Sequence, residues 1–223
     1  QASAKKEGVV GRKHPAIPLA ANLYQPVREN SAGLDLADDS VLKELNDKVQ
    51  KYIQHTWTCQ PEIAGLNNAD FDNIIAQEIR NPSKHADIVG TVKETALDQI
   101  DTALTQAEQA FVEWNQTDRQ QRAAILLKAS NMMQARIQEL MVLLNRESGK
   151  TYSNGIAEVR EAVDFLKYYS AQTESLSTEQ NFQALGPVLC ISPWNFPLAI
   201  FTGQIAAALL AGNTVLAKPA EQT

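Results

Sequence analysis

The sequence predicts an α/β protein in which an extended connector and a series of amphipathic helices precede one strand-helix-strand unit. Apolar residues recur at steps of three and four through residues 97–171, the spacing of helices with one buried face. Two short apolar runs, 188–191 and 214–217, flank an apolar segment of helix length, as in a βαβ unit. The prolines and glycines of residues 1–33 interrupt any long helix there.

The composition is that of an ordinary globular protein. The 223 residues, 44% of them hydrophobic, can form one substantial domain or two small ones. A net charge of −6 argues against nucleic acid or an anionic membrane as partner. The sequence offers neither an apolar run long enough to span a bilayer nor a secretory signal, so we expect a cytoplasmic protein. Gln1 is not a Met, and Thr223 closely follows a strand-like run, so we expect a piece of a longer polypeptide.

The first part of the chain is expected to contain one helix and one strand. We interpret residues 1–33 as a linker from a preceding domain. Helical spacing of apolar residues predicts a short helix over residues 40–56. Residues 57–92 are irregular until a turn signal at 81–84 introduces Ile88–Val92, which has the pattern of a strand, so a hairpin arm fits this region.

Three longer helices are predicted between residues 95 and 171. Thr95 is placed to cap the first, whose apolar residues end at Trp114. Asp118 begins the second, whose single apolar face continues to the stop signal at Gly149. The third covers residues 154–171, and we expect its charged face to lie in solvent: Glu158, Arg160, Glu161, Asp164 and Lys167.

The last segment predicts the βαβ unit. Val188–Ile191 is an unbroken apolar run, typical of a parallel strand that is buried on both faces and away from the sheet edge. Residues 197–210 are apolar on all sides, as in a helix packed on a sheet, and residues 214–217 predict the second strand with a right-handed crossover. Because the chain offers no further strands to cover this unit, we expect its burial to be incomplete.

Polar and aromatic residues follow both predicted strands. Ligands of parallel α/β sheets bind outside the carboxyl ends of the strands, here residues 192–197 and 218–221. The first segment presents Asn195 between two aromatic residues and two prolines, and the second a cation and a carboxylate three residues apart. Taken singly, these residues have ordinary interpretations, namely a turn-forming asparagine, core aromatic residues and a solvated surface pair.

The cysteines and histidines predict no metal or disulfide. Cys59 and Cys190 are too few for a disulfide framework and lack ligand spacing. Cys190 lies within an apolar strand, where a thiol keeps a high pKa, so we expect a structural role. The three histidines stand far apart, and we expect no metal site.

Two longer stretches, GPVLCISPWNFPL from Gly186 and AGNTVLAKPAEQT from Ala211, closely resemble the aldehyde dehydrogenase superfamily. The resemblance implies a Rossmann-like, NAD-binding unit that begins at residue 186. It further implies that Asn195 donates to the oxyanion formed when a thiolate attacks the aldehyde, and that Phe196 faces the aldehyde's carbon chain. Lys218 and Glu221 would bind the adenosine ribose hydroxyls, and the nicotinamide end would be lined by Ile191, Ser192, Pro193 and Trp194.

The usual G-x-G-x-x-G fingerprint is absent. In the family that this chain resembles, the phosphate-binding turn, the nucleophilic cysteine and the general-base glutamate all lie downstream of the segment matching 186–223. We therefore expect an incomplete cofactor unit here and no activity from this chain alone. Cys190 should not be taken for the nucleophile.

Three segments, 30–36, 158–169 and 195–203, resemble the pyrroline-5-carboxylate dehydrogenase domain of bifunctional proline utilisation A enzymes. The resemblance implies NAD-dependent oxidation of glutamate semialdehyde to glutamate in proline catabolism, with FAD only in a preceding proline dehydrogenase half. Residues 34–185 would be the helical N-terminal part of that domain. Glu161 is a candidate substrate-site carboxylate, although a solvated helix charge explains it equally well.

The expected partners are a small-molecule aldehyde and the rest of the parent polypeptide, and a homo-oligomer is compatible with the sequence. Two alternatives remain. The first is a dehydrogenase for another semialdehyde, such as succinate semialdehyde, against which the segment 30–36 argues. The second is a non-catalytic helical interaction domain, because most of the chain consists of helices with apolar faces.

Overall fold

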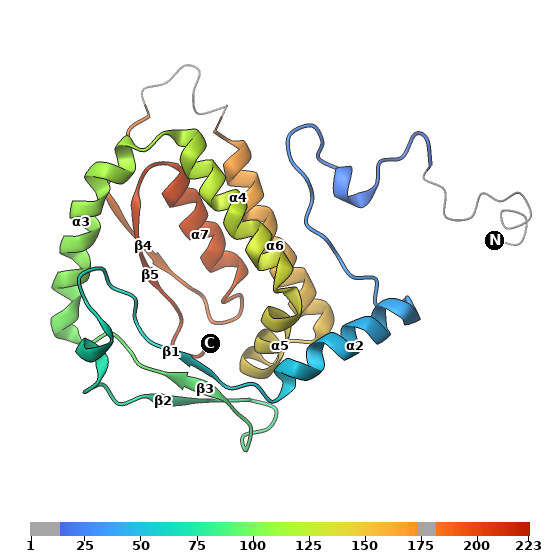
Figure 1. Ribbon diagram of the computed structural model, residues 1–223, viewed down its shortest axis with the longest axis horizontal. Helices are drawn as coiled ribbons and strands as arrows, with labels where there is room; N and C mark the ends of the chain where they lie inside the picture. Colours follow the sequence, from blue (N-terminus) through green and yellow to red (C-terminus); the bar gives the residue numbers. More distant parts are fainter. Residues whose placement is uncertain (1–13, 174–181) are drawn as a thin grey trace, which may run out of the picture.

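The computed structural model describes residues 14–173 and 182–223, and it has the predicted mixed α/β character (Figure 1). Alongside its helices the chain forms two small sheets, one of three strands and one of two. In the view of Figure 1, α3 (Ile100–Gln116) and α4 (Arg119–Ala135) form an arch around the βαβ unit. No helix in the described part of the chain is long and apolar enough to cross a membrane.

The connector is bound to the helices rather than free over its described part. Residues 1–13 lie outside the described residues, and the following segment contains one 3-10 turn, Ala20–Asn22. Asp164 of α6 (Tyr152–Ala171) holds the segment, because its carboxylate accepts hydrogen bonds from Ser31 N (2.9 Å) and Ser31 Oγ (2.7 Å) and pairs with Arg28 Nη1 (2.8 Å). The connector is therefore fixed to α6 shortly before the first helix.

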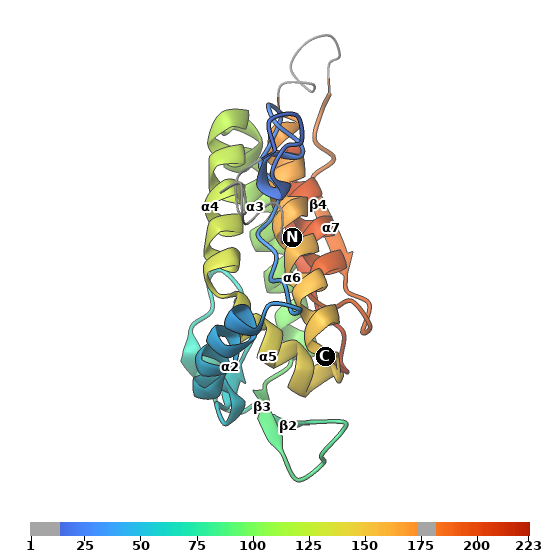
Figure 2. The same cartoon turned by 90° about the vertical axis from the view of Figure 1, so that its right-hand side faces the viewer.

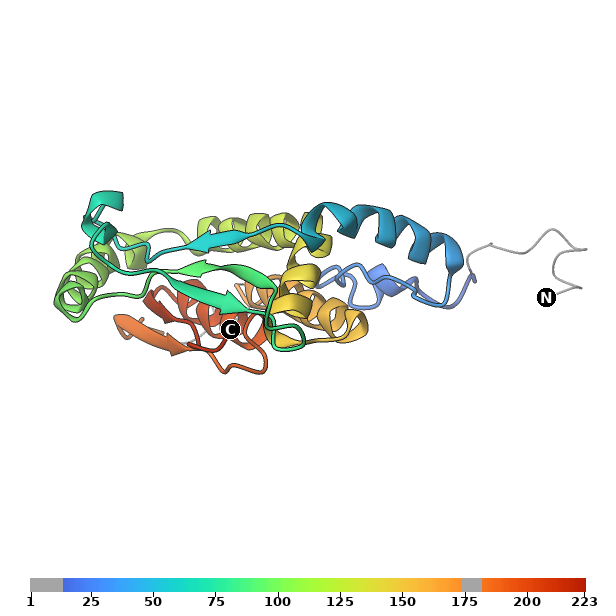
Figure 3. The same cartoon turned by 90° about the horizontal axis from the view of Figure 1, so that it is seen from below.

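The three-stranded sheet contains the predicted hairpin. β2 (Gln77–Arg80) and β3 (Ile88–Val92) pair antiparallel, while β1 (Trp57–Cys59) joins the other edge of β3 in parallel. A 3-10 turn, Asn68–Phe71, lies between β1 and β2. The hairpin projects from one end of the molecule, and all three strands are visible from below (Figures 2 and 3). At Gly90 a Cβ would come within 2.3 Å of the carbonyl oxygen of Trp57, so only glycine allows β1 to pair there.

The helix boundaries required two corrections. Thr95 does not cap a helix: a 3-10 turn, Leu97–Gln99, precedes α3, and the Gln99 side chain accepts a hydrogen bond from Ala96 N. The predicted continuous helix after Asp118 is instead two, α4 and α5 (Ile137–Ser148), with Arg136 in a non-helical conformation between them. Asp118 does cap α4, and α2 (Asp39–Ile53) is capped in the same way by Asp38.

α6 forms the centre of the helical core. Its apolar residues contact α2 and α5 at one end and α4 and α7 (Ala199–Leu210) at the other. The predicted solvent-exposed charged face of α6 was partly wrong, because Glu158 and Lys167 are buried (1% and 6% exposed). A buried carboxylate or ammonium group needs hydrogen-bond or ion-pair partners. The partners of Glu158 lie at the candidate site.

The βαβ unit consists of β4 (Pro187–Ile191), α7 and β5 (Thr214–Lys218), with both strands parallel and Ile191 opposite Lys218. The prediction that β4 is buried on both faces and lies away from an edge was wrong. Each strand pairs only with the other among the described residues, and Leu189 and Ile191 are 60% and 54% exposed. The expected incomplete burial of this unit is confirmed by the same exposure.

Candidate functional site at the carboxyl ends of β4 and β5

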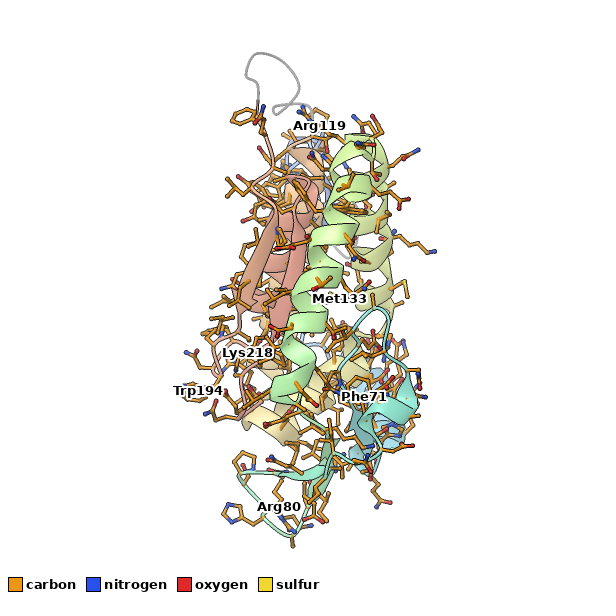
Figure 4. All side chains as sticks on the ribbon, turned by 90° about the vertical axis from the view of Figure 1, so that its left-hand side faces the viewer. Phe71, Arg80, Arg119, Met133, Trp194 and Lys218 are labelled. Carbon is orange, nitrogen blue, oxygen red and sulfur yellow. The ribbon has the colours of Figure 1, made fainter. Side chains whose placement is uncertain are left out.

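The parallel register of β4 and β5 brings the two predicted site segments together. Both strands end at the same edge, so residues 192–197 lie beside residues 218–221. Ser192 N donates to the Lys218 carbonyl oxygen (2.9 Å), and Thr223 Oγ1 donates to that of Trp194 (2.8 Å). Figure 4 shows Trp194 and Lys218 near each other on this side of the molecule. Sequence reasoning from strand ends thus located the edge correctly.

The turn after β4 is fixed by its own residues. The buried Ser192 hydroxyl lies 3.1 Å from the Pro193 carbonyl oxygen and 3.4 Å from that of Pro197, so one donor group bridges both ends of the turn. Ile191 and Trp194 on either side are exposed, and Pro193 is half-buried. The turn therefore offers an open apolar and aromatic surface next to a rigid backbone.

Asn195 lies at the exposed part of this turn. Its amide makes no hydrogen bond to any residue that the structure describes, so both N–H donors are available to a ligand. The neighbouring Phe196 ring is 39% exposed and has the Lys150 ammonium nitrogen 4.3 Å from its centroid. The site thus combines a neutral donor with a partly covered aromatic ring.

Sequence reasoning missed two residues at this turn, Glu158 and Lys150. Glu158 Oε1 accepts hydrogen bonds from the backbone N–H groups of Leu198 (2.9 Å) and Ala199 (3.3 Å), at the start of α7. Its other oxygen lies 2.8 Å from Lys150 Nζ. The helical pattern of residues 154–171 placed Glu158 on the polar face, and nothing in the local sequence indicated a partner 40 residues away.

Lys218 and Glu221 form an ion pair at the end of β5, with 2.7 Å between Nζ and Oε1. The hydrogen bond from Lys218 lowers the pKa of Glu221, and both side chains are about half exposed. Such an exposed pair contributes little to stability. Lys218 and Glu221 can therefore give up their mutual contact and bind ligand hydroxyls instead at a low cost in free energy.

Of the remaining candidate residues, Glu161 lies on the same helix as Glu158, and the two cysteines are poorly suited to chemistry at this edge. Glu161 is exposed on α6, one turn beyond Glu158. Burial raises the pKa of the Cys190 thiol within β4, whereas Cys59 is exposed in the other sheet. Across residues 14–173 and 182–223, no three His, Cys, Asp or Glu side chains are grouped to hold a metal ion. A shallow depression between residues 60 and 71 borders none of the candidate residues.

Comparison with known proteins agrees with this geometry. Residues 72–223 match the aldehyde dehydrogenase family. The bifunctional protein PutA of Klebsiella aerogenes is 49% identical over 220 residues, which cover 99% of this chain and 16% of that protein. The chain therefore spans about one sixth of the length of this curated relative.

Solved structures share the arrangement of the chain. The crystal structure of proline utilization A from Bdellovibrio bacteriovorus, inactivated by N-propargylglycine, superposes with a TM-score of 0.83 at 27% identity, covering 94% of this chain and 22% of that one. The 1-pyrroline-5-carboxylate dehydrogenase from Thermus with bound NAD gives a TM-score of 0.77 at 28% identity, covering 94% of this chain and 41% of that one.

Proposed function

Since the chain belongs to the aldehyde dehydrogenase family, we propose that it is part of an NAD-dependent dehydrogenase that oxidises L-glutamate γ-semialdehyde, the open form of pyrroline-5-carboxylate, to glutamate. The observation that carries the proposal is the shared edge of β4 and β5, where the turn that carries the exposed Asn195 lies beside the segment that carries Lys218 and Glu221. Similarity to PutA and to pyrroline-5-carboxylate dehydrogenase supports the substrate and a role in proline catabolism, within a bifunctional parent protein.

The residues at this edge fit a nicotinamide dinucleotide. Vicinal ribose hydroxyls both donate and accept hydrogen bonds, and Lys218 and Glu221 provide one donor group and one acceptor group 2.7 Å apart. The nicotinamide end would lie along the open surface of the turn, against Ile191, Ser192, Pro193 and Trp194. Bound NAD would accept hydride from the substrate carbon.

Three further residues would act on the aldehyde. Asn195 would donate an N–H to the oxyanion, and a neutral donor suits charge that develops only in the transition state. Phe196 would face the substrate's carbon chain with the part of its ring that Lys150 leaves open. Glu161, one turn along α6 from the turn-binding Glu158, would bind the substrate's α-ammonium group.

The nucleophile of the reaction would come from elsewhere in the parent protein. The buried Cys190 cannot reach a substrate at the turn, and its raised pKa disfavours the thiolate. Cys59 belongs to β1 in the other sheet. We therefore propose that the 223-residue chain alone does not reduce NAD with glutamate semialdehyde.

The test is Asn195→Ala in the full-length protein, with NADH formation from pyrroline-5-carboxylate as the readout. Loss of one oxyanion donor should lower kcat by about 10²–10³-fold. Asn154→Ala, which removes an exposed asparagine of α6, should leave kcat unchanged. Lys218→Ala should raise KM for NAD with little effect on kcat, because ribose contacts persist from ground to transition state.

Two other results would contradict the proposal, and each would favour a different function. Full activity of Asn195→Ala would favour a non-catalytic scaffold role for this region. A higher kcat/KM for succinate semialdehyde than for glutamate semialdehyde would make the enzyme a dehydrogenase of another semialdehyde. An Asn195 effect of the expected size, together with preference for glutamate semialdehyde, supports the proposed activity.

A further inference from the structure

From these contacts we infer that the buried Glu158 and the partly buried Lys150 together position the Asn195 turn. The pair would hold the oxyanion donor in register with the reacting carbonyl. The inference rests on the proposed function of Asn195. It concerns two residues that need not touch substrate or cofactor, and whose effect on the reaction would pass through the backbone of the turn.

Glu158 supplies the cap that α7 lacks. The helix begins at Ala199 without a side-chain cap of its own, and its first backbone N–H groups would otherwise be unsatisfied. The Glu158 carboxylate accepts hydrogen bonds from the N–H groups of Leu198 and Ala199 and places negative charge at the positive end of the helix dipole. An anchor from α6 therefore fixes the chain three residues after Asn195.

Lys150 fixes the carboxylate from the opposite side. Glu158 is 1% exposed, and Lys150 is the one cation paired with it among the described residues. A buried carboxylate without a counter-ion is strongly disfavoured, and the Lys150 ammonium group, 2.8 Å away, supplies that counter-ion and holds the side chain in place. The same ammonium lies over the Phe196 ring, so it contacts the turn directly as well.

The backbone of Lys150 is itself held at a helix terminus. Gly149 ends α5 in the left-handed conformation (φ 68°), which glycine adopts without strain. Asn145 Nδ2 then donates to the Lys150 carbonyl oxygen (2.7 Å), and Lys150 N donates to that of Leu144 (3.4 Å). The ammonium group therefore extends from a rigid point of the helical core to the turn.

The chain between the anchor and Asn195 is short and stiff. Phe196 and Pro197 are the only residues between Asn195 and Leu198, and the proline ring restricts φ at its position. A displacement at Leu198 is consequently transmitted to the Asn195 amide. Misplacement of a catalytic donor by about 1 Å can lower a rate by about 10²-fold.

A double-mutant cycle in the full-length enzyme tests the inference. Lys150→Met should lower kcat by at least about tenfold in the Asn195 protein, and in the Asn195→Ala background it should lower kcat by less than about twofold, since the displaced donor is already gone. Glu158→Gln, which is isosteric and keeps an acceptor for the two N–H groups, should show the same background dependence with a smaller loss. Thermal unfolding of each variant confirms that it is folded.

Lys167→Met is the matched control, because Lys167 is a buried lysine of α6 whose nearest carboxylate is Glu29 (4.0 Å) in the connector. Lys167→Met should change the stability of the protein, and any effect on kcat should be the same in the Asn195 and Asn195→Ala backgrounds. An equal fractional loss from Lys150→Met in both backgrounds, or an unchanged kcat, would overturn the positioning role. Wild-type kcat for Asn195→Ala would instead overturn the proposed function, so the two failures are distinguishable.

Discussion

Replacing Arg146 by methionine should destabilise the fold more than any surface change on the same helix. Arg146 is buried and pairs bidentately with Asp87, through Nη2 to Oδ1 (2.7 Å) and Nε to Oδ2 (3.1 Å). It also donates to the backbone carbonyls of Tyr52, His55 and Ile88. One side chain thus joins the hairpin turn, the end of α2 and the end of α5.

Removing one partner of a buried ion pair costs about 3–5 kcal/mol. Asp87 retains 24% of its side-chain exposure and can be partly rehydrated, so we expect about 3 kcal/mol for Arg146→Met. Arg146→Lys keeps the charge but not the planar fork, and should lose roughly half of that amount. The backbone carbonyls of Tyr52, His55 and Ile88 lose their hydrogen-bond donor in Arg146→Met, and this loss accounts for the rest of the expected destabilisation.

Urea unfolding followed by circular dichroism measures the effect, with the slope checked for two-state behaviour. Arg136→Met is the control, because Arg136 is exposed and pairs with Glu139 only three residues away, so its loss should cost less than about 1 kcal/mol. Equal losses for the Arg146 and Arg136 variants would refute the view that Arg146 anchors the hairpin.

Three further predictions follow from single contacts. Hydrogen bonding to Arg146 lowers the pKa of Asp87 from 3.8 to about 2, so the folded state binds fewer protons and about 2 kcal/mol of stability should disappear as the pH falls from about 4 to 2. Asp87→Asn should therefore lose about 2 kcal/mol less than the unmodified chain over this pH range. Gly90→Ala should cost at least about 2 kcal/mol in urea unfolding, because its Cβ would meet the Trp57 carbonyl. Gly33→Ala is the control, because Gly33 is exposed and an added Cβ would come no closer than 3.5 Å to the Arg160 side chain. At pH 8 a thiol reagent should modify Cys59 at once and Cys190 only on unfolding, and rapid double labelling would contradict the burial of Cys190.

Local patterns predicted the elements of the βαβ unit well. The strands and helix of the βαβ unit were each within a few residues of their predicted bounds. The break at Arg136 was not predictable, since the apolar residues of α4 and α5 form one stripe in the sequence. Leu126 of α4 packs with α7, whereas Met141 of α5 packs with α2, so the two halves of the stripe have different partners on either side of the break.

The candidate site was predicted from strand ends and from resemblance. The two residues that hold its turn in place, Glu158 and Lys150, were not predicted. The segments that carry Asn195 and the Lys218–Glu221 pair lie side by side because parallel strands end at one edge, a rule that needs no side-chain detail. Glu158 looked like a solvated helix charge because its partners are backbone N–H groups, which every residue carries and no sequence pattern reveals. Lys150 was missed for the same reason, since its role depends on where Glu158 points.

The two-stranded sheet of the βαβ unit also affects how strongly the purified chain associates with itself at high concentration. β4 and β5 each have one unpaired edge among the described residues, and alternation along β4 turns Leu189 outward while Cys190 points into the core. At high concentration, copies can extend this ladder edge to edge, and turbidity should rise with protein concentration. Leu189→Lys, which adds charge to the outer face and leaves the inner face unchanged, should therefore extend the useful concentration range of the purified chain.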